Sequence, residues 1–402
     1  MRIAIAAAAV AVFSVTVDIA AQERGRFQQF RSAPDYWTAD RIKNAKPAPM
    51  PQVDPDLLLD QEPLTIEPHA DEPVQGEPGA LPTEDATEDL QRQLHDDEAE
   101  VPYDLDPLAD DPRANDLDSE LGLDPVDEDG FDFDPLSVSR IGAVYTQNRV
   151  LEPRRAMQLH PYRQIGKLFY RDPRTGDAFV CSGAAIQLTL VATAGHCVFN
   201  AEGRYFNTSF LFVPGYARGF APNGVWAARG GLVTPEWARG GGRVPNAADF
   251  AILWMHGLDR RNGAACNNFA ANPNCLAIGE VTGWFGWRTN TVHRTHVTVI
   301  GYPGNLDNGL APQETHAQPF QLLEPNTVVF GSGMGPGSSG GPYMADFGRA
   351  AAGQFPERRN RLVGIMSFGN LEARFSGTSI LNASFTDMVN QLCDVGPDVC
   401  RR

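Results

Sequence analysis

Residues 190–197 have the sequence LVATAGHC, and the fold can be inferred from this stretch outward. Residues 190–192 are apolar, as in a buried strand, and Gly195 ends the regular segment. The pattern therefore places His196 at a strand-to-loop junction, directly before Cys197. Similar short apolar segments separated by turns recur between residues 162 and 381, which is typical of an all-β sandwich or barrel.

The segments on either side of this stretch predict antiparallel strands. A turn at residues 172–177 joins the first two strands as a hairpin. One helix is expected near the end of the chain, because Met388, Val389 and Leu392 fall on one side of residues 385–393. The expected strands are residues 164–171, 178–188, 210–213, 225–229, 250–255, 296–302, 327–330, 362–368 and 378–381.

The net charge of −17 is distributed very unevenly along the 402 residues. Residues 51–134 hold 29 acidic and 2 basic side chains, whereas the balance is +3 over residues 1–50 and +7 over residues 135–402. The acidic segment also contains eleven prolines and little apolar surface, so we expect it to be mostly disordered. Its charge says nothing about partners of the β region, where no nucleic-acid motif accompanies the scattered arginines.

The N-terminus and the cysteines both indicate export. Arg2 precedes an apolar stretch of residues 3–17 and then Ala20 and Ala21, which is the layout of a signal peptide over residues 1–21. All six cysteines follow residue 180, and none has the CxxC spacing of a zinc or redox site. We therefore expect a secreted or periplasmic protein with no membrane association after signal removal. Spacing favours the disulfide pairs Cys181–Cys197, Cys266–Cys275 and Cys393–Cys400 over the other fourteen pairings.

Three segments of the β region carry chemically useful side chains. His196 follows the first strand, Asp249 leads into the apolar strand at 250–255, and residues 335–342 have the sequence GPGSSGGP. Glycines around a serine let the backbone approach a substrate and point its N–H groups into a site. Taken singly, each feature is more often a turn or a flexible loop, so their joint occurrence is the informative observation.

In the order His, Asp, Ser, these segments resemble the chymotrypsin and trypsin superfamily of serine proteases. Further matches at residues 162–169, 181–183, 212–216 and 301–304 resemble its bacterial V8-like branch, which is related to glutamyl endopeptidases. Residues 36–41, YWTADR, are similar to a segment in propeptides of such proteins. The resemblance implies two packed antiparallel β-barrels, residues 141–275 and 276–402, behind a propeptide at residues 22–140.

The resemblance also implies roles for individual residues. Ser339 would be the nucleophile, His196 the general base and acid, and Asp249 the group that orients the imidazole. Backbone N–H groups of Gly337 and Ser339 would form the oxyanion hole. Ser338 is the weaker candidate nucleophile, because Ser339 directly precedes the two glycines.

The expected substrate specificity follows mainly from side chains that the expected pocket lacks. Gly333 stands at the base of the expected pocket, so no carboxylate awaits Arg or Lys, and Met366 replaces the histidine of glutamyl-specific relatives. We therefore expect an apolar or medium-sized pocket and not a preference for Glu. The residues expected to bind substrate are Gly333, Met334, Met366, Ser367, Phe368, Gly369 and Gly377, with residues 367–369 pairing with an extended peptide.

Residues 140–143, RIGA, resemble an activation cleavage site. Digestive relatives carry Asp where this chain has Ser338, so processing near Arg140 is expected without their internal ion pair. The leader, residues 22–140, is hypothesised to lie against the basic domain through its acidic segment and delay its activity, in which case its effect would weaken with salt.

Cofactors, metals and oligomers are not expected. His293 and His296 have an H-x-x-H spacing, but residues three apart on a strand point to opposite faces, so no metal site follows. The expected partner is a peptide or protein substrate of a monomeric enzyme. Two alternatives remain, a catalytically silent binding or adhesion protein and an esterase with the same triad.

Overall fold

The computed structural model describes most of the chain after residue 137 and three segments before it. The expected signal peptide and most of the acidic leader lie outside the described residues. Among the described residues, no helix is long and apolar enough to cross a membrane. The described residues are 26–30, 36–59, 75–83, 138–267, 269, 272–349, 351, 359–396 and 398–400.

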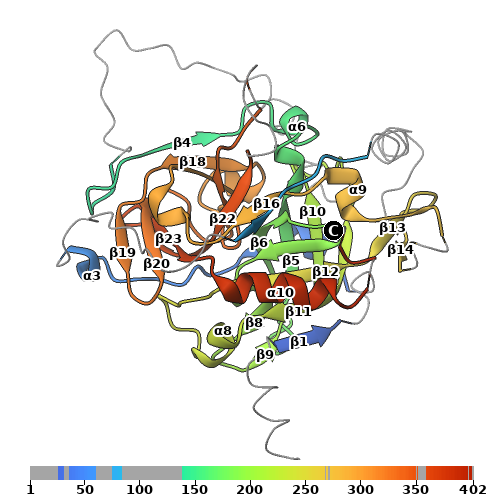
Figure 1. Ribbon diagram of the computed structural model, residues 1–402, viewed down its shortest axis with the longest axis horizontal. Coiled ribbons are helices and arrows are strands. Elements are labelled where there is room, and N and C mark those ends of the chain that lie inside the picture. Colours follow the sequence, from blue (N-terminus) through green and yellow to red (C-terminus); the bar gives the residue numbers. More distant parts are fainter. Residues whose placement is uncertain are drawn as a thin grey trace, which may run out of the picture.

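The first sheet of the β region closes into a barrel (Figure 1). Within the described residues, six of its strands form a ring. The ring closes because β12 (Ala251–Met255) pairs with both β7 (Leu190–Thr193) and β11 (Trp226–Val233). Its core contains large buried side chains such as Phe210, Phe212 and Trp226. In ring order the strands are β10 (Thr208–Pro214), β5 (Ile165–Arg171), β6 (Ala178–Ala185), β7 (Leu190–Thr193), β12 (Ala251–Met255) and β11 (Trp226–Val233).

The second sheet is open, and the strand that precedes the first barrel in sequence belongs to it. That strand, β4 (Tyr145–Arg149), lies within the range expected for the first barrel. It pairs antiparallel with β18 (Gln313–Ala317) and forms the edge of the second sheet. Antiparallel pairing dominates this sheet. The predicted all-β class is confirmed, with the first of the two expected barrels closed and the second present as an open sheet. Along its path the strands are β19 (Gln321–Leu323), β20 (Thr327–Gly331), β23 (Phe375–Ile380), β22 (Arg361–Asn370), β21 (Pro342–Ala345), β17 (Val297–Gly301), β18 (Gln313–Ala317) and β4.

The predicted C-terminal helix is confirmed as α10 (Ala383–Cys393). Asn382 caps it by accepting a hydrogen bond from the Ser384 N–H. The ring of Phe385 packs edge-on against Phe250 at 5.6 Å and Trp287 at 5.4 Å. The helix therefore joins the first barrel to β16 (Gly286–Arg288), which pairs with β22 of the second sheet.

The three disulfides favoured by spacing are present in the structure, Cys181–Cys197, Cys266–Cys275 and Cys393–Cys400. The first ties β6 to the short helix α7 (Gly195–Val198), on which His196 lies. The other short elements are α6 (Pro153–Ala156), η2 (Tyr162–Gln164), β8 (Phe199–Asn200), β9 (Tyr205–Phe206), α8 (Pro235–Arg239), β13 (Gly257–Asp259), β14 (Ala265–Cys266), β15 (Cys275–Leu276), α9 (Ile278–Thr282), η3 (Val292–Arg294) and η4 (Asp307–Gly309).

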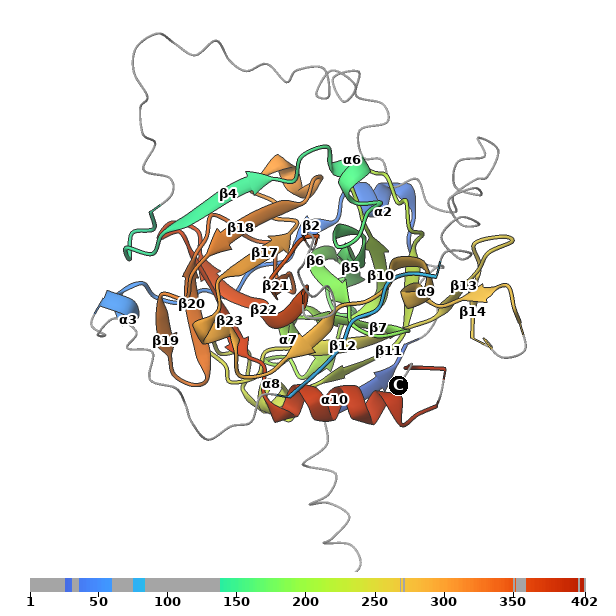
Figure 2. The same cartoon turned by 45° about the horizontal axis from the view of Figure 1, so that its top comes forward.

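The described leader segments are held by both sheets (Figure 2). β1 (Arg26–Gln29) pairs antiparallel with β11, β2 (Lys46–Pro47) pairs parallel with β6, and β3 (Gly76–Glu77) pairs antiparallel with β16. Two short helices, α2 (Ala39–Lys43) and α3 (Asp56–Leu59), lie between these strands in sequence. Each of the three described strands before residue 138 is therefore hydrogen-bonded to a strand of the β region.

Candidate active site

Strand register brings the predicted histidine and aspartate together. β7 pairs with β12 so that Thr193 lies opposite Ala251. His196 follows the end of β7, and Asp249 precedes the start of β12, so the two residues meet at the same edge of the barrel. The disulfide Cys181–Cys197 fixes the short helix α7, on which His196 lies, to β6.

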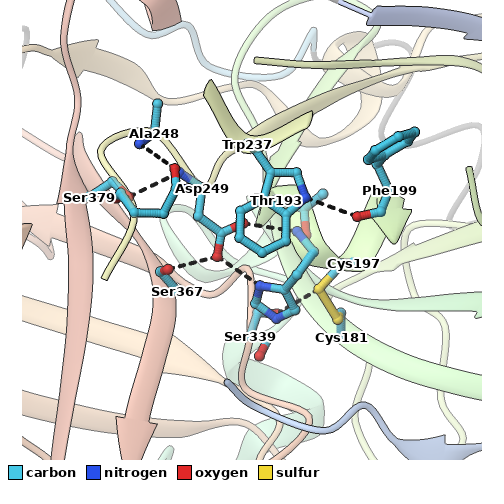
Figure 3. Close-up of polar contacts among 12 residues, drawn as sticks. Cys181, Thr193, Cys197, Phe199, Trp237, Ala248, Asp249, Ser339, Ser367 and Ser379 are labelled. Atoms are coloured by element: carbon cyan, nitrogen blue, oxygen red, sulfur yellow. Dashed lines mark hydrogen bonds and ion pairs between the residues drawn. A yellow bond between two sulfur atoms is a disulfide. The ribbon is translucent and has the colours of Figure 1, made fainter. Parts of the chain in front are cut away.

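The Asp249 carboxylate is fully buried and accepts three hydrogen bonds (Figure 3). Oδ2 lies 2.8 Å from His196 Nδ1 and 2.6 Å from the donating Ser367 hydroxyl, while Oδ1 accepts from the His196 backbone N–H at 2.9 Å. Because a carboxylate can only accept, it selects the imidazole tautomer with its proton on Nδ1. Nε2 is thereby left as an acceptor.

Ser339 lies in a tight glycine turn that packs against the loop before His196. Gly340 has a φ of +83°, and a side chain there would overlap the Thr193 hydroxyl, so this position needs glycine. The Ser339 carbonyl accepts from the Ser182 N–H at 2.7 Å. Within the described part of the chain, Ser339 Oγ and His196 Nε2 are both buried without a hydrogen-bond partner. These are the two atoms between which a serine–histidine pair transfers its proton.

The neighbouring hydroxyl of Ser338 is engaged elsewhere. Its Oγ donates to the Gly335 carbonyl at 2.6 Å and lies 2.8 Å from the Met366 sulfur. The adjacent glycine at 337 has a φ of +95°, and its N–H donates to the carbonyl of the leader residue Ala48 at 3.2 Å. The expected oxyanion donor is therefore directed at a carbonyl group.

The expected pocket residues include two buried methionines and three glycines that contact other side chains. Met334 and Met366 are fully buried in one apolar cluster of the second sheet. Gly369 faces the side chain of leader residue Met50. A side chain at Gly377 would overlap the Phe368 ring, so this glycine makes room for that ring. Gly333 lies beside the Gln147 amide, which accepts from its N–H at 3.3 Å.

Sequence reasoning missed several contacts of this region. Ser367 was expected to bind substrate, but its hydroxyl also holds the Asp249 carboxylate, and Ser379 accepts from the Asp249 N–H at 3.0 Å. Gln147 reaches the pocket from β4, which no strand prediction covered. Long sequence separations hid these contacts, because neither a serine nor a glutamine in a strand marks a site by itself.

The expected processing site is accessible. The Arg140 side chain is 69% exposed and pairs loosely with Glu372 at 3.7 Å. Ile141, the next residue, is buried in an apolar cluster with Phe368 and Phe375. The peptide bond expected to be cleaved near Arg140 would thus lie between an exposed arginine side chain and the buried Ile141.

One group of potential metal ligands occurs among the described residues, Cys181, His196 and Cys197. The two cysteines form a disulfide and are therefore not thiolate ligands. His293 lies in η3, and His296 stacks on His316 with ring centroids 6.5 Å apart.

No family model matches the chain. The curated glutamyl endopeptidase of Bacillus licheniformis is 25% identical over 187 residues, which cover 46% of this chain and 49% of that protein. This relative confirms the predicted resemblance to the V8-like branch. The chain spans about half the length of this curated relative.

Solved structures of proteases are also similar to this chain. Protease Anisep from Arthrobacter nicotinovorans is 25% identical, with a TM-score of 0.47 over 58% of this chain and 97% of that one. A Glu endopeptidase in complex with MPD is 20% identical, with a TM-score of 0.45 over 61% of this chain and 95% of that one.

Proposed function

We propose that this protein is an exported serine endopeptidase that is made as an inactive precursor. The observation behind the proposal is the hydrogen-bonded chain Ser367–Asp249–His196, which leaves the imidazole Nε2 free to accept a proton. Among the described residues, Nε2 and the proposed nucleophile, Ser339 Oγ, are both buried without a hydrogen-bond partner. The resemblance to a glutamyl endopeptidase supports peptide bonds as the target. The disulfides support an oxidising, extracytoplasmic location.

In the proposed mechanism, Ser339 Oγ attacks the carbonyl carbon of the scissile peptide. His196 Nε2 takes the hydroxyl proton as the C–O bond forms, and Asp249 stabilises the resulting imidazolium. The Gly337 N–H stabilises the negative oxygen, an interaction that contributes about 3 kcal/mol in related oxyanion holes. His196 then gives its proton to the amide nitrogen as the C–N bond breaks and the amine leaves. In the second half, His196 takes a proton from water as the water oxygen attacks the acyl carbon, and it returns that proton to Ser339 Oγ as the ester bond breaks.

The proposed substrate preference is an apolar P1 side chain, P1 being the residue whose carbonyl is attacked. Met334 and Met366 line an apolar region beside Gly333, and none of the three carries charge. A Lys, Arg or Glu side chain would lose its hydration there without gaining an ionic partner from these residues. Release of the active form by cleavage near Arg140 completes the proposal.

A fluorophosphonate probe on processed protein tests the function. We expect labelling at Ser339 and a loss of labelling in His196→Ala, because the probe requires an activated serine. Absent labelling in processed wild-type protein would favour a silent binding protein. Cleavage of ester substrates without cleavage of any peptide in a library would favour an esterase.

A further inference from the structure

Leader residues 46–53 cross the molecule between the two sheets, at the proposed catalytic cleft. At one end, Lys46 and Pro47 pair with Phe179 and Val180 of β6, and the Ala48 N–H donates to the Val180 carbonyl at 2.9 Å. At the other end, Gln52 forms a bridge with Gly369 of β22. Backbone hydrogen bonds therefore hold the segment at both sides of the cleft.

The centre of this segment fills the positions that a substrate would need. The Ala48 carbonyl accepts from the Gly337 N–H at 3.2 Å, which is the expected oxyanion donor. Met50 is only 4% exposed and belongs to the apolar cluster of Met334 and Met366. The Gly369 N–H donates to the Pro51 carbonyl at 3.0 Å. Oxyanion donor, pocket and peptide-binding strand are thus all engaged by the leader.

The chain direction of the leader is opposite to that of a substrate. In a substrate, the side chain in the pocket and the carbonyl in the oxyanion hole belong to one residue, and the residues before it run along β22 beside that pocket. In the leader, the carbonyl comes from Ala48 and the pocket side chain from Met50, two residues later. Residues after the carbonyl, such as Gln52, run parallel to β22. A chain placed this way presents its leaving group on the wrong side of the serine.

The composition of the segment suits a stable inhibitor. Pro47, Pro49 and Pro51 limit the backbone freedom that binding would otherwise remove. Residues 46–53 contain no carboxylate, so the acidic charge of the leader takes no part in these contacts. On each flank an apolar anchor holds the segment, Trp37 against Phe169 and Val53 with Leu58 in the cluster of Phe368.

We propose that residues 46–53 inhibit the precursor as a built-in, reverse-bound peptide, with the Ala48 carbonyl in the oxyanion hole and Met50 in the specificity pocket. This inference rests on the proposed protease function. Inhibition would then depend on backbone and apolar contacts of residues 46–53 and not on attraction between the acidic leader and the basic domain. It should therefore persist when salt screens surface charges.

The test uses uncleaved full-chain precursor and the rate of fluorophosphonate labelling at Ser339. Met50→Asp should raise the rate at least about tenfold, because a loss of 1.4 kcal/mol of cleft contact already corresponds to that factor. Ala48→Pro, which removes the hydrogen bond to Val180 without adding charge, should act in the same direction. Leu57→Asp is the matched control, because it adds the same charge to the leader on a side chain that is 52% exposed, and it should leave the rate unchanged.

The outcomes separate this inference from the proposed function. If processed wild-type protein is labelled and both cleft variants of the precursor stay unlabelled, the inhibitor inference is wrong. If processed wild-type protein is not labelled, the protease proposal itself fails. Wild-type precursor should stay equally unreactive at low and at 1 M salt, and activation by salt alone would return the explanation to charge masking. Mass spectrometry adds a check of direction, since leader fragments ending at Ala48 or Met50 would show substrate-like binding.

Discussion

The two halves of the cleft differ in what completes them. The catalytic half, Ser367, Asp249 and His196, is hydrogen-bonded entirely within the β region. The binding half, comprising the Gly337 N–H, the Gly369 N–H and the methionine pocket, is filled by the leader. In the proposed precursor, the hydrogen bonds of Asp249 and His196 are therefore already formed, and the leader occupies the place of the substrate. Activation would then require removal of a peptide, with little rebuilding of the triad.

The largest expected effect breaks the catalytic half itself. Ser339→Ala or His196→Ala in processed protein should lower kcat on the order of a millionfold, as loss of either member does in other serine proteases. Steady-state kinetics with a peptide substrate measures this. The two single variants and the double variant should fall to a similar level, because the residues act as one unit. Additive losses would contradict a shared mechanism.

Ser367→Ala should affect the catalytic half from the strand expected to bind substrate, because the Ser367 hydroxyl supports the Asp249 carboxylate. Loss of a hydrogen bond to a buried carboxylate costs about 1.5–3 kcal/mol, so kcat should fall about 10- to 100-fold with KM little changed. Ser379→Ala is the control. Ser379 accepts a hydrogen bond from the Asp249 backbone N–H and not from its carboxylate, so kcat should be retained. A rise in KM without loss of kcat would assign Ser367 to the binding half.

The binding half should be revealed by the P1 side chain of the substrate. Fluorogenic peptides that differ only at P1 should show a kcat/KM for Met about 10- to 100-fold above that for Ala, from the 1.5–3 kcal/mol of burying such a side chain. A Glu peptide should be cleaved less well than the Met peptide. Preference for Glu would show that groups other than Met334 and Met366 define the pocket.

The last expected effect concerns stability and not activity, at the place where the leader residue Trp37 packs against Phe169. Burial lowers the pKa of Lys167 to about 7, beneath the rings of Phe169 and Tyr216. Between this value and the ordinary lysine pKa the unfolded chain binds more protons, so the Lys167 contribution to stability rises from pH 7 to about 10. Urea unfolding of the full chain should show this rise. Lys167→Met should remove it, and an unchanged pH profile in the variant would contradict the assignment.

The sequence predicted the six strands of the first barrel, four strands of the second sheet, the C-terminal helix and the disulfide pairs, because their signals are local. Apolar periodicity, turn residues and cysteine spacing depend on neighbours within a few positions. The triad candidates were also local, since GSSGG and AGHC are short motifs. By contrast, β4 and Gln147 carried no such signal, because their roles depend on pairing with β18, more than 160 residues away.

The chemically useful side chains, a histidine, an aspartate and a serine among glycines, can be read from the sequence, as can the acidic segment before them. What these groups face depends on how the two sheets and the leader pack together. A run of prolines around Ala48 and Met50 carries no mark of an inhibitor, since its contacts to Gly337 and Gly369 span roughly 300 residues. Such contacts arise when two sheets pack and leave strand edges and a buried N–H to be paired, a requirement that no local pattern encodes.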